Sequence, residues 1–166
     1  MATRTTIAAA CLTFAMYANV GNAQGTDDTS LLEIAAAKAM LQRSDIPRTR
    51  IAIEPGFATA EAAPGHGAIA RTARTPTRNS ALQAGLKAVR VASLGQLRNC
   101  DRCGLTGADV LLTLTDPIIA GALASVTVTA LYNGTRGRLE YETVKFTFTR
   151  SANSWVVSKI EQLGVS

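Results

Sequence analysis

The stretch TVKFTFT, residues 143–149, decides the fold class, because its apolar and polar side chains alternate with a period of two. Such alternation is typical of a β-strand with one face in a core and the other toward water. We expect this strand to extend over about 139–150. Three further runs of strand-like composition lie nearby, at about 108–115, 123–132 and 154–163. Short turns between neighbouring strands favour antiparallel pairing, so the C-terminal third predicts a four-stranded antiparallel meander.

The preceding part of the chain predicts two helices. Ser30 and Glu33 have the spacing of a capping box, in which each side chain satisfies a free backbone N–H at a helix start. Good helix formers follow, which predicts a first helix over about 31–43. The same spacing recurs at Ser80, ahead of a predicted second helix over about 81–92. Helices first and a meander last predict an α+β domain, with the helices packed on one face of a curved antiparallel sheet of about four strands.

The segment between these helices has a weaker pattern. Residues 49–54 alternate as a short strand would, and Pro55-Gly56 is expected to end that strand. The following 58–79 region is rich in Ala, Gly, Pro, Thr and Arg and has neither a helical nor a strand period. We therefore expect a flexible Arg/Ala/Gly/Pro-rich loop there.

The first residues have the composition of a secretory signal peptide. Arg4 supplies a positive start, and the uncharged apolar run 7–17 is too short to span a bilayer. Gly21 and Ala23 provide the small residues that a signal peptidase recognises, which predicts a signal peptide over 1–23 with cleavage near Ala23. The remainder, 24–166, is expected to be one secreted or periplasmic domain without a membrane span. An N-terminal core helix is the alternative interpretation of the same residues.

Three cysteines bear on this expectation. Cys11 lies inside the expected signal, where a lipid anchor is an alternative, although only six residues separate it from Arg4. Cys100 and Cys103 would then be the two thiols of the mature chain, and an even pair in an exported protein predicts a disulfide. A redox pair and a zinc site are the alternatives. A zinc site would need two ligands besides these cysteines, and His66 is the single histidine. We therefore predict no metal site.

The formal net charge is +5, and the positive charge is concentrated in the middle of the chain. A basic segment of this kind attracts anionic polymers at long range. Binding of a polyanion by Arg71, Arg74 and Arg78 is therefore one hypothesis. The alternative is a solvated loop, because no aromatic side chain lies between Arg71 and Arg102 to stack on bases.

The closing strands resemble those of the nuclear transport factor 2-like superfamily. The resemblance is carried by Ala124-x-Val126-x-Val128, by Val144-x-Phe146-x-Phe148 and by the tryptophan-bearing run 154–160, and it covers about residues 108–163. It implies a strongly bent sheet that wraps a cone-shaped cavity beside N-terminal helices. Enzymes of that superfamily, such as ketosteroid isomerases and polyketide cyclases, place an acid, a histidine or a tyrosine inside the cone. The early Arg-rich segment departs from the pattern, so no catalytic residue is carried over.

Three polar side chains are the candidate ligand-binding residues. Glu140 and Glu142 share the strand face of Val144, and Tyr132 shares the face of Val128. In a curved sheet, they would lie at the mouth of an apolar cavity. The alternative is that these three side chains are simply exposed to solvent beyond the core.

Two functions follow from these residues. The first is an exported non-enzymatic module that binds a small apolar ligand or a protein partner. The second is a cone-type isomerase or cyclase-like enzyme that uses Glu142 or Tyr132. The sequence leaves open whether the protein is an enzyme. It has no nucleotide-binding loop, dinucleotide fingerprint or metalloprotease motif, and we predict no cofactor and assign no catalytic residue.

Overall fold

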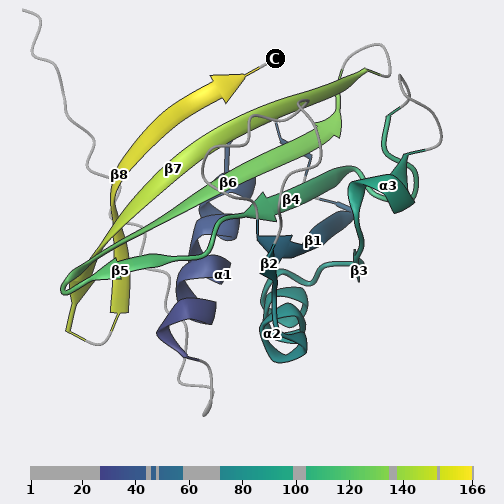
Figure 1. The fold of residues 1–166 in the computed structure, drawn as a ribbon. Coiled ribbons are helices and arrows are strands. Elements are labelled where there is room, and N and C mark those ends of the chain that lie inside the picture. The colour runs from purple at the N-terminus through teal and green to yellow at the C-terminus, as the bar shows by residue number, and fades with distance from the viewer. Residues whose placement is uncertain are drawn as a thin grey trace, which may run out of the picture.

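The computed structural model describes residues 27–43, 46, 47, 49–57, 72–98, 104–134, 138–152 and 154–165. Within them, the elements follow in the order α1 (Asp28–Leu41), β1 (Ile51–Phe57), β2 (Thr72–Ala73), α2 (Pro76–Leu86), β3 (Arg90–Val91), α3 (Leu94–Leu97), β4 (Val110–Leu114), β5 (Ile118–Ala120), β6 (Leu123–Asn133), β7 (Leu139–Ser151) and β8 (Ser154–Val165) (Figure 1). The protein is α+β, as predicted. The expected signal peptide at 1–23, the Cys100–Cys103 pair and His66 lie outside the described residues.

The described strands form one mixed sheet, whose main path is β2-β1-β4-β6-β7-β8. The predicted antiparallel meander is its larger half, because β4 pairs with β6, β6 with β7 and β7 with β8, all antiparallel. The expectation of about four strands was wrong. β1 runs parallel to β4 and β3 runs parallel to β1, while β2 and β5 form short antiparallel edges. Helices do not simply precede strands, because β1, β2 and β3 lie among the helices in chain order.

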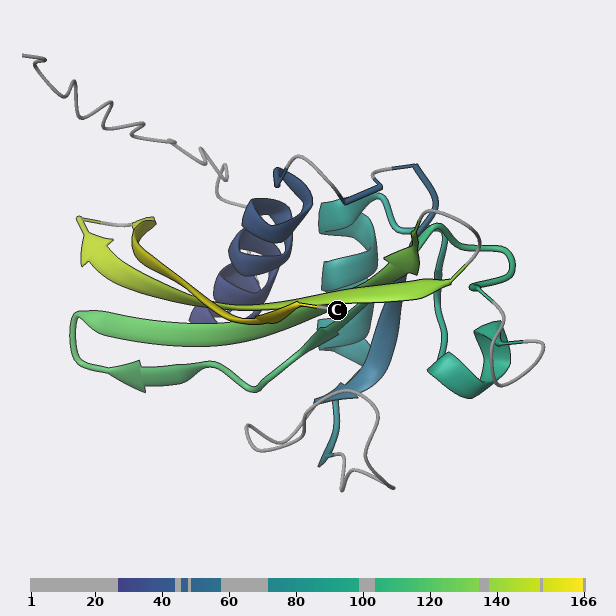
Figure 2. The same cartoon turned by 90° about the horizontal axis from the view of Figure 1, so that it is seen from above.

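Helices α1 and α2 lie side by side on one face of the sheet (Figure 2). The main core fills the space between them and the strands. Its helical members include Leu32, Met40 and Leu82, and its strand members alternate along the chain, as a half-buried strand requires. On β7 these are Val144, Phe146 and Phe148, all fully buried, which confirms the predicted inward face of this strand. Gly85 of α2 brings the two helices close, since a Cβ there would lie 2.9 Å from the Cδ1 atom of Ile34.

A second, smaller core lies on the opposite face of the sheet. Its buried members are Ala52, Ala92, Leu97, Leu105, Ala108 and Leu111. Because Leu111 alternates with main-core residues on β4, that strand is covered on both faces, and all five of its residues are buried. β4 is thus the centre of the fold.

Both long helices begin at caps other than the predicted ones. Asp27 caps α1, and its carboxylate accepts the backbone N–H of Ser30 at 2.8 Å. The predicted box failed because Glu33 points into the interior and pairs with arginines there. α2 begins at Pro76 after the Thr75 cap, earlier than the predicted helix over 81–92, since proline is well suited to the first helical turn.

The predicted loop over 58–79 is corrected in its second part. Residues 72–79 form β2 and the first turn of α2, while 58–71 lie outside the described residues. The expected end of the strand at Pro55-Gly56 was also wrong, because β1 continues to Phe57. The register between β1 and β4 shifts between Ile53 and Phe57, and an irregularity of this kind tolerates a proline inside a strand.

Candidate functional site

The three predicted ligand-binding residues lie together on the helix-covered face of the sheet. In the register of β6 and β7, Tyr132 is opposite Glu140 and Ala130 is opposite Glu142. Residues directly opposite each other share a face, so the predicted grouping of these side chains is what the structure shows. Tyr132 and Glu140 are half-buried, and Glu142 is buried with 6% of its surface exposed.

Glu142 is held by a cation from the chain that follows α1. The Nη2 atom of Arg43 lies 2.5 Å from Oε1 of Glu142. A buried carboxylate needs such a counter-ion, because burial of a lone charge is costly. The pair ties β7 to the chain that follows α1.

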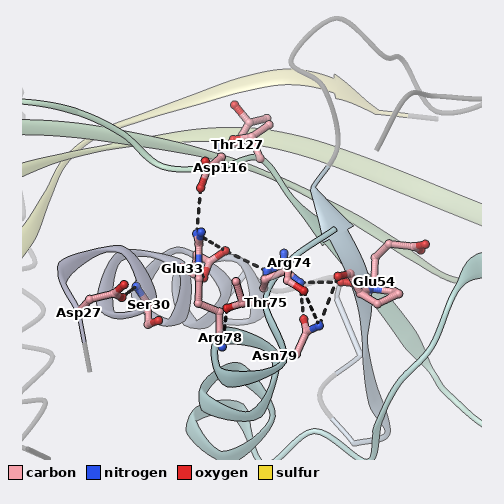
Figure 3. Close-up of polar contacts among 12 residues, drawn as sticks. Asp27, Ser30, Glu33, Glu54, Arg74, Thr75, Arg78, Asn79, Asp116 and Thr127 are labelled. Carbon is pink, nitrogen blue, oxygen red and sulfur yellow. Dashed lines mark hydrogen bonds and ion pairs between the residues drawn. The ribbon is translucent and has the colours of Figure 1, made fainter. Parts of the chain in front are cut away.

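A second group of charges, the Glu33 cluster, joins α1 to the start of α2 and is buried at its centre, Glu33 and Arg74 (Figure 3). We define it as Glu33, Arg74, Arg78 and Asp116. The Nε atom of Arg74 lies 3.0 Å from Oε1 of Glu33, and both of these side chains are fully buried. Arg78 donates to the other carboxylate oxygen of Glu33 at 3.2 Å and to Asp116 at 2.9 Å. Two guanidinium groups therefore hold one buried carboxylate.

Further contacts extend the Glu33 cluster to β1. The Nη1 atom of Arg74 donates to the backbone oxygen of Glu54 at 2.7 Å and to the side-chain oxygen of Asn79 at 3.0 Å. Asn79 in turn donates to the backbone oxygen of Pro55 at 3.3 Å. Figure 3 shows Arg74 lying between Glu33 on α1 and Glu54 on β1. The cluster thus ties β1, β2 and both helices to one another.

The protonation of the Glu33 cluster follows from its burial. Burial raises the pKa of Glu33, and the charges of Arg74 and Arg78 oppose that shift. Burial likewise lowers the pKa of Arg74, while Glu33 opposes the shift. Each group thus supports the charged form of the other, and removal of either would leave a charge in the interior. The geometry indicates that these ion pairs and hydrogen bonds hold α1, β1 and α2 together.

These contacts bear on the polyanion hypothesis. Arg74 is buried against Glu33, and Arg78 is bound between Glu33 and Asp116. Arg71 lies outside the described residues. Carboxylates of the same chain thus already engage two of the three arginines proposed to attract a polyanion.

A third ionic contact joins the starts of the parallel strands β1 and β4. Asp109 accepts from Nε of Arg50 at 3.1 Å, from Nη2 at 2.5 Å and from the backbone N–H at 3.0 Å. The hydroxyl of Thr49 donates to the same carboxylate. The hydrogen bonds from Arg50, and next that from Thr49, lower the pKa of Asp109 to about 2.

Exposed apolar side chains lie in two groups on the sheet, one on the neighbouring strands β5 and β6 and the other on β8, which lies beyond β7. Among the described residues, seven large apolar side chains are exposed, and only Val89 lies off the strands β5, β6 and β8. The other six are Ile118, Ile119, Leu123, Ile160, Leu163 and Val165. Strand β8 pairs with β7 alone within the described part of the chain, so its second edge presents unpaired backbone groups. This edge, with its side chains, is the candidate interaction surface.

The sequence pattern did not indicate the Glu33 cluster or this surface. A signal for the cluster was present, because Glu33 interrupts the apolar run between Leu32 and Ile34, and a buried acid requires a partner. Its partners lie 41 and 45 residues away, which local spacing does not reveal. For β8, strand periodicity located the strand but did not indicate that Ile160, on the helix-covered face, is exposed.

Two observations concern metals and membranes. Among the residues that the structure describes, no three His, Cys, Asp or Glu side chains gather in a group that could hold a metal ion. Within the same ranges, no helix has the length and apolar character needed to cross a membrane.

Comparison with known proteins adds no relative to this description. No family model matches the sequence, and neither a curated protein nor a solved structure matches it significantly.

Proposed function

We propose that this chain is an exported, non-enzymatic module that binds a protein partner through the edge strand β8 of its sheet. The observation that carries the proposal is that β8 exposes three large apolar side chains, those of Ile160, Leu163 and Val165. Apolar surface that gathers in this way is typical of interaction sites in soluble domains.

The free edge of β8 is a second feature that suits a protein partner. A free strand edge carries a row of backbone donors and acceptors, and an added strand satisfies them while its alternate side chains give specificity. β8 has 12 residues, and its exposed Ile160, Leu163 and Val165 lie where an added strand would cover them. Burial of such surface contributes roughly 25 cal/mol per Å².

The packing favours a protein partner over a small apolar ligand or a cone-type enzyme. The ligand and enzyme hypotheses need Glu142 to face a substrate, whereas Glu142 is paired with Arg43. They also need apolar strand residues to face a space, whereas Val144, Phe146 and Phe148 pack in the main core. A protein partner requires only the surface that is exposed.

Export is supported by the sequence of residues 1–23, with its positive start, short apolar run and small residues at Gly21 and Ala23. Mass spectrometry of the exported protein should find Gln24 at the N-terminus, within a residue or two. Retention of Met1 would contradict export by this route.

Site-specific photo-crosslinking tests the binding surface. Ile160, which is 54% exposed, is replaced by p-benzoylphenylalanine, and Val89, which is 49% exposed, provides a control of matched exposure away from β8. Irradiation in the producing cell should give a discrete polypeptide adduct from position 160 that position 89 does not give. Equal adduct patterns from the two positions would overturn the proposal.

A further inference from the structure

Strand β8 has nearly the same residue pattern in both directions from Ile160. Lys159 precedes it and Glu161 follows it, so opposite charges flank the centre. Three positions out on either side lie the apolar Val157 and Leu163. Trp155 and Val165, five positions out, extend the symmetry. A strand with this pattern is complementary to a second copy of itself running in the opposite direction.

The structure places the two charges where an added strand would meet them. Lys159 is opposite Thr147 and Glu161 is opposite Lys145, so both charges lie on the sheet face that points away from α1 and α2. The Nζ atom of Lys159 lies 3.2 Å from Oε2 of Glu161. Both side chains are exposed, and β8 is the outermost strand of the main path.

The backbone between these charges is regular. The register between β7 and β8 skips Ser158 and Leu163, where the pairing shifts, and it is continuous from Lys159 to Gln162. Ile160 lies opposite the buried Phe146, on the helix-covered face, yet it is itself exposed. A second strand that pairs across this regular segment would therefore cover Ile160.

We propose that the partner of this surface is a second copy of the chain, with the two β8 strands paired antiparallel about a two-fold axis at Ile160. This inference rests on the proposed function, whose partner it names. In this arrangement Lys159 of each copy lies opposite Glu161 of the other, and Ile160 lies opposite itself. Opposite charges directly across an antiparallel pair stabilise it, and the two sheets become continuous.

The same charges select the register. Moving the axis to residue 159 would place Lys159 opposite itself, and moving it to residue 161 would place Glu161 opposite itself. Like charges directly opposite each other destabilise the pair. Only the axis at Ile160, among these three, satisfies both charges.

Charge reversal, followed by sedimentation velocity over a concentration series of the mature protein, tests the arrangement. Wild type should show a reversible monomer–dimer equilibrium. Either Lys159→Glu or Glu161→Lys alone creates two like-charge pairs in the homodimer and should weaken it about tenfold. An equimolar mixture of the two variants should restore dimerisation, because each copy then meets its opposite charge at both positions. The double variant Lys159→Glu/Glu161→Lys should dimerise like wild type.

Lys87→Glu provides the matched control. It reverses the same charge on an exposed residue just past α2, and it should leave the dimer unchanged. Restored dimerisation in the mixture but not in either variant alone would establish the register. Single reversals without effect, or a wild-type protein that stays monomeric throughout, would overturn the inference.

The two proposals can fail separately. A purified monomer together with a photo-adduct to a different polypeptide at position 160 would overturn the second-copy inference and leave the binding surface intact. Equal adducts at positions 160 and 89 would remove both.

Discussion

Strands β4 and β8 belong to the same sheet, but they bury their side chains in opposite ways. All five residues of β4 are buried between the main and second cores, whereas β8 has side chains that are exposed or at most half-buried. Charged side chains in the two regions also differ in how deeply they are buried. Glu33 and Arg74 pair with each other in the interior, while the paired Lys159 and Glu161 of β8 are exposed at an edge. The comparison separates the part of the sheet that stabilises the fold from the part offered to a partner.

The largest expected effect comes from breaking the buried cluster. Glu33→Ala leaves Arg74 charged in the interior and should lower the free energy of unfolding by about 3–5 kcal/mol. The matched variant Glu161→Ala removes an exposed acid from β8 and should change it by less than about 0.5 kcal/mol. Urea unfolding followed by circular dichroism, at a concentration where the protein is monomeric, measures both. Similar losses from the two variants would remove the distinction between the two regions.

An intermediate effect is expected at the Arg43–Glu142 pair. Arg43→Ala leaves the buried carboxylate of Glu142 without this cation and should cost about 1–3 kcal/mol of unfolding free energy. Adding Glu142→Gln should recover part of the loss, because the uncompensated charge is then gone. Thermal or urea unfolding of the single and double variants completes the cycle. Strictly additive losses would show that the pair contributes little.

A smaller effect is expected in the middle of β8. Ile160→Ala removes a half-exposed side chain and should lower monomer stability by roughly 1 kcal/mol or less. The same change should weaken self-association, because Ile160 lies at the proposed two-fold axis. Unfolding at low concentration and sedimentation at high concentration separate the two effects. A large loss of monomer stability would instead place Ile160 in the core.

The smallest effect is a pH dependence at the start of β4. The pKa of Asp109 is lowered to about 2 in the folded state, below its ordinary value of 3.8. Its hydrogen bonds therefore stabilise the fold fully above pH 3.8, and this contribution is lost as the pH falls toward 2. Arg50→Met should flatten the decline of the melting temperature across this window. An unchanged decline would show that this contact does not contribute to acid sensitivity.

The C-terminal half of the fold was predictable because its information is local. Alternation in 143–149 identified β7 and its buried face, and the neighbouring strands followed from the same rule. Tyr132, Glu140 and Glu142 were also grouped correctly on one face. What local spacing could not show was that Arg43 neutralises Glu142.

The N-terminal half depends on contacts between distant residues, and the predictions for it were less accurate. The pairing of β1 with β4 is parallel and joins segments far apart in the sequence. The cap of α1 was misplaced because Glu33 fits a capping box by spacing but serves a buried ion pair instead. Arg74 and Arg78 were expected in a loop. Their acidic partners come from other elements, so local spacing gave no sign that these arginines form ion pairs.

The parallel pairing of β1 with β4 also has a consequence for the order of folding. Arg50 and Asp109, which join the starts of these strands, are 59 residues apart, whereas the turns that connect β6, β7 and β8 are short. Closing the longer loop carries the greater entropic cost, so the C-terminal hairpins should form first and β1 should dock late. Pulse-labelled amide hydrogen exchange during refolding should therefore find the amides of β7 protected before those of β1. A chain that emerges N-terminus first must therefore keep the apolar β1 unpaired until β4 arrives, and this interval is when the protein is most exposed to aggregation or proteolysis.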